Sequence, residues 1–349
     1  MKRKTWIGWG IALGLVAVLY LFGAGALRAQ MEDAMSSACG RPVSIRSARI
    51  TLPPGILLSG IEVPPAPRES AAPFSIGQLS AHLAAGQFLQ GKVGLSVEVQ
   101  RPRLVIQWTP QAKLLFSPDS FKNAAGSAPM PLARLKIEGG ELTFVDETVL
   151  PAVSWNFRDL QAEVSADRGP GEYSVHLSAR MVGDAQENLG KVGIDGSVIS
   201  QGPVDGTVSV EHLKIERLSP YLRRILGAAP TQGQAQLTSR VTVDHGVAMT
   251  HNEVIASGVV FPNGERTTLD LEGNRLVELL RDPEGKIHLG FIVTGKLGGK
   301  LDWSDLAAGA LREAMRQALS KSIQNVLQQS QDSRPAGEVL QEKLESIGR

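Results

Sequence analysis

The sequence predicts a mainly β protein in which a long antiparallel sheet follows a transmembrane helix and precedes amphipathic helices. Three observations lead to this fold class. Apolar and polar residues alternate at a period of two through much of residues 40–302, glycine and proline are frequent between these runs, and a long uncharged segment lies near the start. Alternation is typical of half-buried strands, whereas glycine and proline favour turns.

The chain begins with a basic and then strongly apolar segment. Three basic residues at positions 2–4 precede an uncharged run that extends to Leu27. As a helix, residues 7–27 would be about 31 Å long, enough to cross the hydrocarbon core of a bilayer. The positive-inside rule then predicts a single-pass protein of the bacterial inner membrane, with the bulk of the chain in the periplasm. A cleaved signal peptide is the alternative, because Ala24-Gly25-Ala26 resembles a cleavage site; the length of the run favours a retained anchor.

Each expected strand has one apolar and one polar side. Val175 and Leu177, for example, alternate with His176 and Ser178. This pattern predicts antiparallel strands with one side exposed to water. Residues on the apolar sides are the candidate lining of a groove: Leu135, Ile137, Leu142, Phe144, Val175, Leu177, Val208, Val210, Val241, Val243, Leu289 and Phe291.

The number of strands limits how the sheet can be arranged. About fifteen alternating runs are expected. A twisted open sheet of more than about ten strands tends to curl or to split. A sandwich would seal the apolar sides against each other, whereas a curled trough would leave them open, and the alternation is the same in both. The turns expected between the runs are Pro53-Pro54-Gly55, Gly139-Gly140, Gly169-Pro170-Gly171, Gly202-Pro203, Asp205-Gly206, His245-Gly246 and Asn263-Gly264.

Residues 269–303 predict a helix, a turn and a strand in that order. Leu276, Val277, Leu279 and Leu280 recur at helical spacing. Asp282-Pro283-Glu284-Gly285 should end the helix, because the residue before a proline is disfavoured in the α conformation. A strand then follows, in which the apolar residues are Ile287, Leu289, Phe291 and Val293.

The tail has a different character. A helix over 304–327 carries an apolar stripe, and a shorter helix is expected over 339–347. The longer helix offers a surface for a protein partner, or a plug over one end of a groove. The expected organisation is therefore a cytoplasmic stub and anchor over 1–29, a periplasmic β domain over 30–302 and a helical tail over 303–349.

The composition and motifs argue against several function classes. The chain has 36 basic and 35 acidic residues, a balance that does not favour a nucleic-acid partner. The six histidines lack metal-binding spacing, and no nucleophile elbow or phosphate-binding loop is present. Asp146 and Glu147 are adjacent on an expected strand and so point to opposite sides, which suits a solvated strand end better than an acid–base pair. The sequence therefore predicts neither an enzyme nor a cofactor.

Cys39 is the single cysteine, so an internal disulfide is excluded. The serines and alanine before it only faintly resemble a lipid-attachment site. A partly buried, unmodified thiol is the expected state.

Several segments resemble the AsmA-like family, in a branch long catalogued as a domain of unknown function. The opening segment CGRPVSIRSARITLPPGILLSGIEVPPAPRES, the continuation over 72–108, LKIEGGELTFVDE over 135–147 and residues 235–303 follow the order of that family's motifs. One departure is Gly298-Gly299-Lys300, where the family usually has an acidic residue. The family consists of membrane-anchored periplasmic proteins and supplies no catalytic residues.

The resemblance implies an elongated, curled sheet that forms a repeating β-groove. It also implies that the groove shelters lipid tails, with phospholipid as the ligand, and contributes to phospholipid transport or envelope homeostasis between the inner and outer membranes. The alternative is a structural or assembly factor for envelope proteins that binds no lipid, with a sealed core and the 304–327 helix as its docking element.

Overall fold

A computed structural model describes residues 25–37, 39–51, 55–65, 72–84, 94–109, 132–169, 171–183, 185–199, 202–296 and 303–331. The chain forms two compact units. The first lies within Met1–Thr148 and Ser154–Ser174, and the second within Val149–Val153 and Val175–Arg349.

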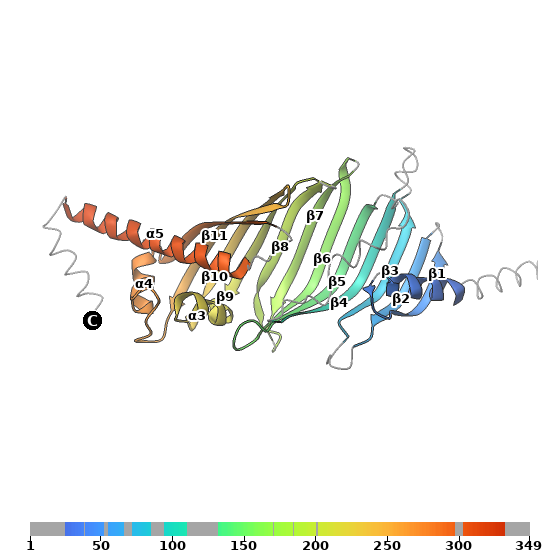
Figure 1. Cartoon of the computed structure of the whole chain (residues 1–349), viewed down its shortest axis with the longest axis horizontal. Helices are drawn as coiled ribbons and strands as arrows, with labels where there is room; N and C mark the ends of the chain where they lie inside the picture. The colour runs from blue at the N-terminus through green and yellow to red at the C-terminus, as the bar shows by residue number, and fades with distance from the viewer. Residues whose placement is uncertain are drawn as a thin grey trace, which may run out of the picture. The chain divides into compact units, whose positions relative to one another are not determined.

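Within the described residues, twelve strands form one open sheet, in which every strand neighbours the next strand along the chain (Figure 1). This finding confirms the mainly β fold class. The strands are β1 (Ser44–Thr51), β2 (Gly55–Val63), β3 (Phe74–Leu83), β4 (Leu95–Trp108), β5 (Leu132–Asp146), β6 (Val153–Gly169), β7 (Glu172–Val182), β8 (Asn188–Ile199), β9 (Val204–Lys214), β10 (Gln232–Asp244), β11 (Val247–Val260) and β12 (Lys286–Lys296). The described helices are one over 25–37, the 3-10 helix η2 (Ile215–Leu218), α3 (Ser219–Leu226), α4 (Gly273–Leu280) and α5 (Trp303–Gln331).

The sheet is mixed, which departs from the expected, mainly antiparallel sheet. β4 and β5 are parallel, with Val97 opposite Leu135 and Ile106 opposite Phe144. Parallel neighbours require a crossover connection of roughly a dozen residues or more. Residues 109–131 provide that length, and all of them except residue 109 lie outside the described residues.

A line of left-handed residues crosses the strands of the first unit. Gly60, Arg101, Gly139 and Asp159 have φ angles of 63°, 51°, 62° and 51°. We call these four residues the first seam. Leu58 and Ile61 are three positions apart and would face opposite sides of a regular strand, yet both are buried in one core, because left-handed Gly60 lies between them.

The first seam corrects the sequence interpretation at Gly139-Gly140. These glycines lie inside β5, so Leu135 and Ile137 belong to the same strand as Leu142 and Phe144. The apparent break in the alternation is a change of phase within one strand. When such changes of phase are interpreted as the ends of strands, one strand is counted as two. The expected number, about fifteen, was too high for this reason.

The second unit also has residues with positive φ inside its strands, at Gly190, His212, Gly233 and Gly258. Around His212 the register with β10 shifts by one residue, so Val210 lies opposite Leu237 and Leu213 opposite Ala235. Val210 and Leu213 therefore face the same side although they are three positions apart. Asp205-Gly206, expected as a turn, also lies inside β9.

Several other turns are confirmed. Gly202-Pro203 connects β8 to β9, where the Gly202 N–H donates to the Ile199 carbonyl over 2.8 Å. His245-Gly246 joins β10 to β11, and Asn263-Gly264 follows β11 as a turn. Of the remaining expected turns, Gly55 begins β2, Gly169 ends β6 and Gly171 precedes β7, whereas Pro53, Pro54 and Pro170 lie outside the described residues.

The helix, turn and strand expected over 269–303 are confirmed as α4, its turn and β12. The Asp282 carboxylate accepts hydrogen bonds from the backbone N–H groups of Glu284 and Lys286 over 2.9 and 2.8 Å, which closes the turn. These N–H groups, that of Lys286 foremost, hold the pKa of Asp282 below its ordinary value. Within α4, Leu276 and Val277 are buried against the sheet.

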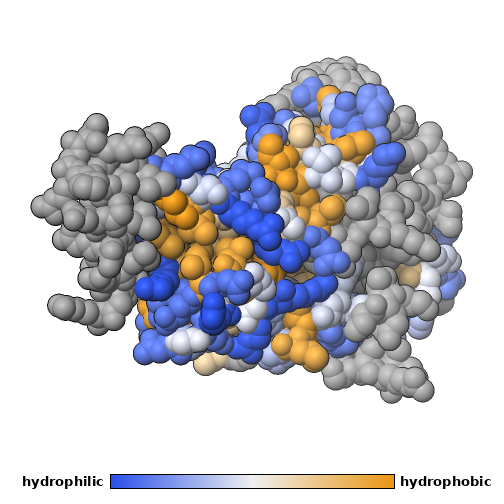
Figure 2. All heavy atoms as spheres, turned by 60° about the vertical axis from the view of Figure 1, so that its left-hand side comes forward, coloured by the Kyte–Doolittle hydropathy of each residue, from blue (hydrophilic) through white to orange (hydrophobic). Residues whose placement is uncertain are grey.

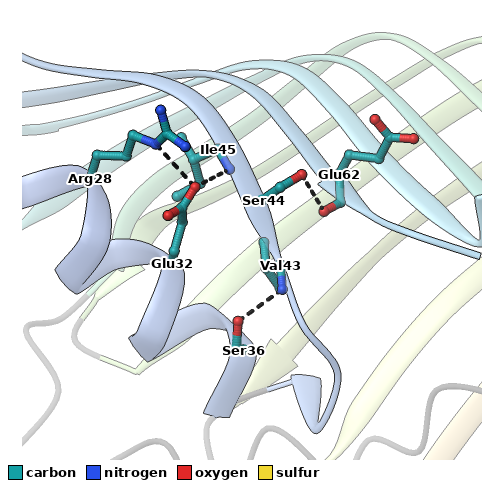
Figure 3. Close-up of polar contacts among 7 residues, drawn as sticks. All are labelled: Arg28, Glu32, Ser36, Val43, Ser44, Ile45 and Glu62. Atoms are coloured by element: carbon teal, nitrogen blue, oxygen red, sulfur yellow. Dashed lines mark hydrogen bonds and ion pairs between the residues drawn. The ribbon is translucent and has the colours of Figure 1, made fainter. Parts of the chain in front are cut away.

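A helix over 25–37 packs on the first strands (Figure 3). Leu27, Met31 and Met35 contact a core that includes Ile45, Ile61 and Val63. The helix also binds backbone groups at the start of the sheet: Glu32 Oε1 accepts the N–H of Ile45 over 2.7 Å, and Ser36 Oγ accepts the N–H of Val43 over 2.8 Å. These contacts cover part of the β1 edge.

The expected membrane anchor over 7–27 lies outside the described residues except for its last three positions. Of the helices that the structure describes, none is both long and apolar enough to cross a bilayer.

Candidate apolar binding face

Strand register places the candidate residues of β9, β10 and β12 on one side of the second unit. Directly opposed residues in paired strands point to the same side of a sheet. The pairings form four rows across the strands, which we call the apolar face: Val210, Leu237, Val254 and Leu289; Val208, Ser239, Asn252 and Phe291; Gly206, Val241, Thr250 and Val293; Val204, Val243, Ala248 and Gly295.

All but one of the candidate residues on this face are only partly covered by the described part of the chain. Val208, Val210, Val241, Val243 and Phe291 are half-buried, whereas Leu289 is buried. A core between two packed sheets would bury such residues fully.

The other side of the same strands is mainly polar. Thr207, Arg240 and His251 lie in one row across β9, β10 and β11, and all three are exposed. Arg240 pairs with Asp205 over 3.4 Å. Ile292 is an apolar exception on this side, with 54% of its surface exposed. The expected contrast between one apolar and one polar side is therefore present in β9–β12.

Val175 and Leu177 of β7 belong to the apolar side as well. His176 Nδ1 lies 2.7 Å from Asp195 Oδ1 of β8, and Asp195 is opposite Thr207 of the polar side. Because neighbouring residues on a strand point in opposite directions, the two residues flanking His176 point to the apolar side. Both are half-buried.

A small polar group interrupts the apolar face. The Asn252 amide donates to Thr250 Oγ1 over 2.8 Å and lies 3.3 Å from the carbonyl oxygens of Thr250 and Phe291. Ser239 is next to it in the same row and is buried. The Asn252 amide donor is satisfied locally, so it does not require a polar ligand.

The candidates of the first unit form a similar surface on β5. Leu135 and Ile137 lie opposite Val97 and Val99 of β4, and Leu142 and Phe144 lie opposite Leu104 and Ile106. All four candidates are half-buried. Leu135 and Ile137 also pack against the core that the 25–37 helix covers, so that helix closes part of this surface.

Helices α3, α4 and α5 cover one end of the apolar face in the second unit. Leu226 of α3, Leu276 of α4 and Met315 of α5 are buried in one cluster with Ala235, Ile287 and Leu289 of the sheet. A cavity of about 180 Å³ remains between these helices and the sheet, and every residue that lines it is apolar. The space-filling view shows hydrophobic side chains gathered in a patch bordered by hydrophilic ones (Figure 2).

The sequence interpretation missed α3, which supplies Leu222 and Leu226 to the cavity. Two local signals could have revealed this helix. Pro220 lies in its first turn, and Gly227 ends it with a φ angle of 75°. The alternation on either side of this short segment concealed both signals.

The tail helix was expected over 304–327 and extends over Trp303–Gln331. Its apolar stripe packs only in part. Ala314 and Met315 are buried and Leu319 contacts the cluster, whereas Ile323 is 42% exposed. The expected second helix over 339–347 lies outside the described residues.

Asp146 differs from the expected solvated strand end, because it is buried. Its carboxylate accepts hydrogen bonds from the backbone N–H and the hydroxyl of Thr148, over 2.8 and 2.6 Å, and so holds the turn after β5. Cys39 is partly buried, as expected, and burial raises the pKa of its thiol. Across the described ranges, no cluster of three or more histidine, cysteine or acidic side chains could hold a metal ion.

No protein-family model matches the sequence, and no curated protein matches it.

Proposed function

We propose that this chain is a membrane-anchored envelope protein that shelters the acyl chains of phospholipids on its apolar face. In this role it contributes to phospholipid transport or envelope homeostasis between the inner and outer membranes. The sheet forms a curled trough, with its apolar side inward, and the anchor over 7–27 holds the chain in the inner membrane with its bulk in the periplasm. The segments that resemble the AsmA-like family support the same role.

One observation carries the proposal. Val208, Val210, Val241, Val243 and Phe291 lie together on one side of β9–β12, and each is only half-buried. Leaving the apolar area of these valines and of the phenylalanine in water carries a cost, since burying apolar area is favourable by about 25 cal/mol per Å². An apolar ligand on these rows would remove that cost.

The chemistry of phospholipid transfer fits such a surface. Moving one acyl chain of about sixteen methylenes through water costs roughly 0.8 kcal/mol per methylene, or about 13 kcal/mol in total. A row of aliphatic side chains lowers this barrier, because the chain exchanges one apolar environment for another. The polar headgroup can stay in water at the open side of the trough.

The test is phospholipid analysis of the full chain purified from bacterial membranes in a mild detergent. Wild-type protein is expected to carry phospholipid in stoichiometric amounts. Val208→Asp places a charge on the apolar face and is expected to reduce the bound phospholipid severalfold. Leu177→Asp tests the β7 part of the same side and is expected to act in the same direction.

Thr207→Asp is the matched control. It introduces the same carboxylate one position away, where the side chain is exposed on the polar side. Its phospholipid content and its circular dichroism spectrum should equal those of the wild type. A wild-type preparation free of lipid, with a Val208→Asp variant that unfolds, would contradict the proposal and indicate a sealed core.

The alternative is a structural or assembly factor for envelope proteins that docks through α5. Exposed Ile323, beyond the packed part of the helix stripe, favours this candidate. It predicts that Ile323→Asp removes a protein partner captured by cross-linking in membranes and leaves the phospholipid content unchanged.

A further inference from the structure

We propose that the cavity beneath α3, α4 and α5 receives the methyl end of a phospholipid acyl chain and thereby selects chain length. This inference rests on the proposed function, because it assigns the end of the same lipid-binding face. It concerns a different property, the discrimination between long and short chains.

The chemistry of the cavity limits its ligand. Its lining comes from the sheet and from all three helices, with Ala235, Val254, Leu222, Leu280, Leu311 and Met315 as examples. None of the lining residues has a polar side chain, so a headgroup or a carboxylate would lose its hydrogen bonds there. A hydrocarbon end would lose none.

The cavity continues the apolar face. Leu289 and Phe291 line the cavity, and they also end the rows that contain Val210 and Val208. Phe291 is half-buried, so it lies at the border between the covered and the partly exposed parts of the face. An acyl chain on the valine rows therefore meets the cavity at this border.

The volume indicates how much of a chain can enter. The cavity of about 180 Å³ slightly exceeds the apolar cavity of about 150 Å³ that accommodates benzene in an engineered protein. It can therefore hold the last few carbons of a chain and not a whole chain. Each methylene transferred from water into such a site is expected to strengthen binding about fourfold, until the cavity is full.

The experiment uses the full chain in detergent and an equimolar mixture of phosphatidylglycerols with saturated chains of graded length. Native mass spectrometry reports the proportion of each lipid that is bound. The wild type should prefer chains long enough to reach the cavity. Ala235→Phe fills the cavity from the β10 side and should reduce this preference at least tenfold, whereas Leu280→Ala enlarges the cavity and should shift the preference toward longer chains.

Thr238→Phe is the matched control, because it adds the same ring to β10 on the exposed polar side. It should retain the wild-type preference. A folded Ala235→Phe variant that keeps the wild-type preference for chain length would overturn the inference. If that variant does not fold, an unchanged preference for chain length in Leu280→Ala would overturn it instead. Wild-type protein that binds phospholipid without regard to chain length would overturn the inference alone, whereas binding of no phospholipid would overturn the proposed function.

Discussion

The carboxylate of Glu32 accepts a hydrogen bond from the backbone N–H of Ile45 over 2.7 Å (Figure 3). A side chain of the N-terminal helix thus occupies a backbone donor of β1, the first strand of the sheet. Ser36 Oγ likewise accepts the N–H of Val43, the residue directly before β1. Edge strands with free donors can pair with other chains, and covering them with a helix is one way to prevent such pairing.

We expect Glu32→Ala to loosen this edge. A hydrogen bond to a charged group contributes about 1.5–3 kcal/mol, and partial exposure of the Glu32 side chain reduces this to about 1–2 kcal/mol. Amide hydrogen exchange in β1 should accelerate about fivefold to thirtyfold. Asp33→Ala is the control, since Asp33 is the next residue on the helix and is exposed. Equal exchange in both variants would contradict the role of Glu32.

The same contact predicts a dependence on pH. The N–H of Ile45, with a further contribution from Arg28, holds the pKa of Glu32 below its ordinary value of 4.5. Protonation therefore favours the unfolded state. The stabilisation is complete above about pH 4.5 and is lost as the pH falls through the lowered value. Protection of the β1 amides, expressed relative to Glu32→Gln at each pH, should decline in this acidic range; a constant ratio would exclude the linkage.

The first seam predicts unequal costs for two glycine substitutions. Gly60 and Gly246 both have positive φ, so alanine costs about 1–2 kcal/mol at either position. A Cβ at Gly60 would also lie 2.8 Å from the Cβ of Arg46, whereas Gly246 has open space around it. Gly60→Ala should therefore lower Tm of the full chain clearly more than Gly246→Ala. Similar melting temperatures would show that the contact with Arg46 relaxes without cost.

The attachment of α5 should depend on packing and not on its exposed ion pair. Met315 is buried in the second unit's cluster, and Met315→Ala should destabilise that unit by about 2–4 kcal/mol. Arg224 and Asp305 form a 2.8 Å pair on the surface, and Arg224→Ala should cost less than about 1 kcal/mol. Thermal denaturation and hydrogen exchange in α5 would measure both. A larger loss of stability in Arg224→Ala than in Met315→Ala would show that the ion pair, and not packing, attaches α5.

The proposed location predicts a C-terminus in the periplasm. A reporter enzyme that is active only in the periplasm should be active when fused after Arg349. Replacing the basic residues at positions 2–4 with glutamate should lower this activity, because the positive-inside rule makes them the determinant of orientation for the proposed anchor. Activity of a cytoplasmic reporter alone would contradict the location. A mature N-terminus near Leu27, detected by mass spectrometry, would instead indicate a cleaved signal peptide.

Local patterns in the sequence were sufficient for much of the second unit. The spacing of Leu276 and Val277, the Asp282-Pro283 stop and the alternation around Leu289 predicted α4, its turn and β12, because short-range sterics and side-chain periodicity determine each of them. The candidate residues on β9, β10 and β12 share one face for the same reason. Leu222 and Leu226 escaped prediction, because their helix is short and the strands beside it dominate the pattern.

The sequence by itself determined that the strands have one apolar side, since alternation depends only on neighbouring residues along the chain. Tertiary structure alone decided three features. β4 and β5 are parallel neighbours, and the alternation changes phase within a strand at Gly139 and at His212. In addition, the Glu32 carboxylate accepts the N–H of Ile45. A left-handed residue inside a strand and a turn between two strands have the same local signature. Only pairing with the neighbouring strands distinguishes them. The ladder of interstrand hydrogen bonds continues past a left-handed residue inside a strand, whereas it ends at a turn.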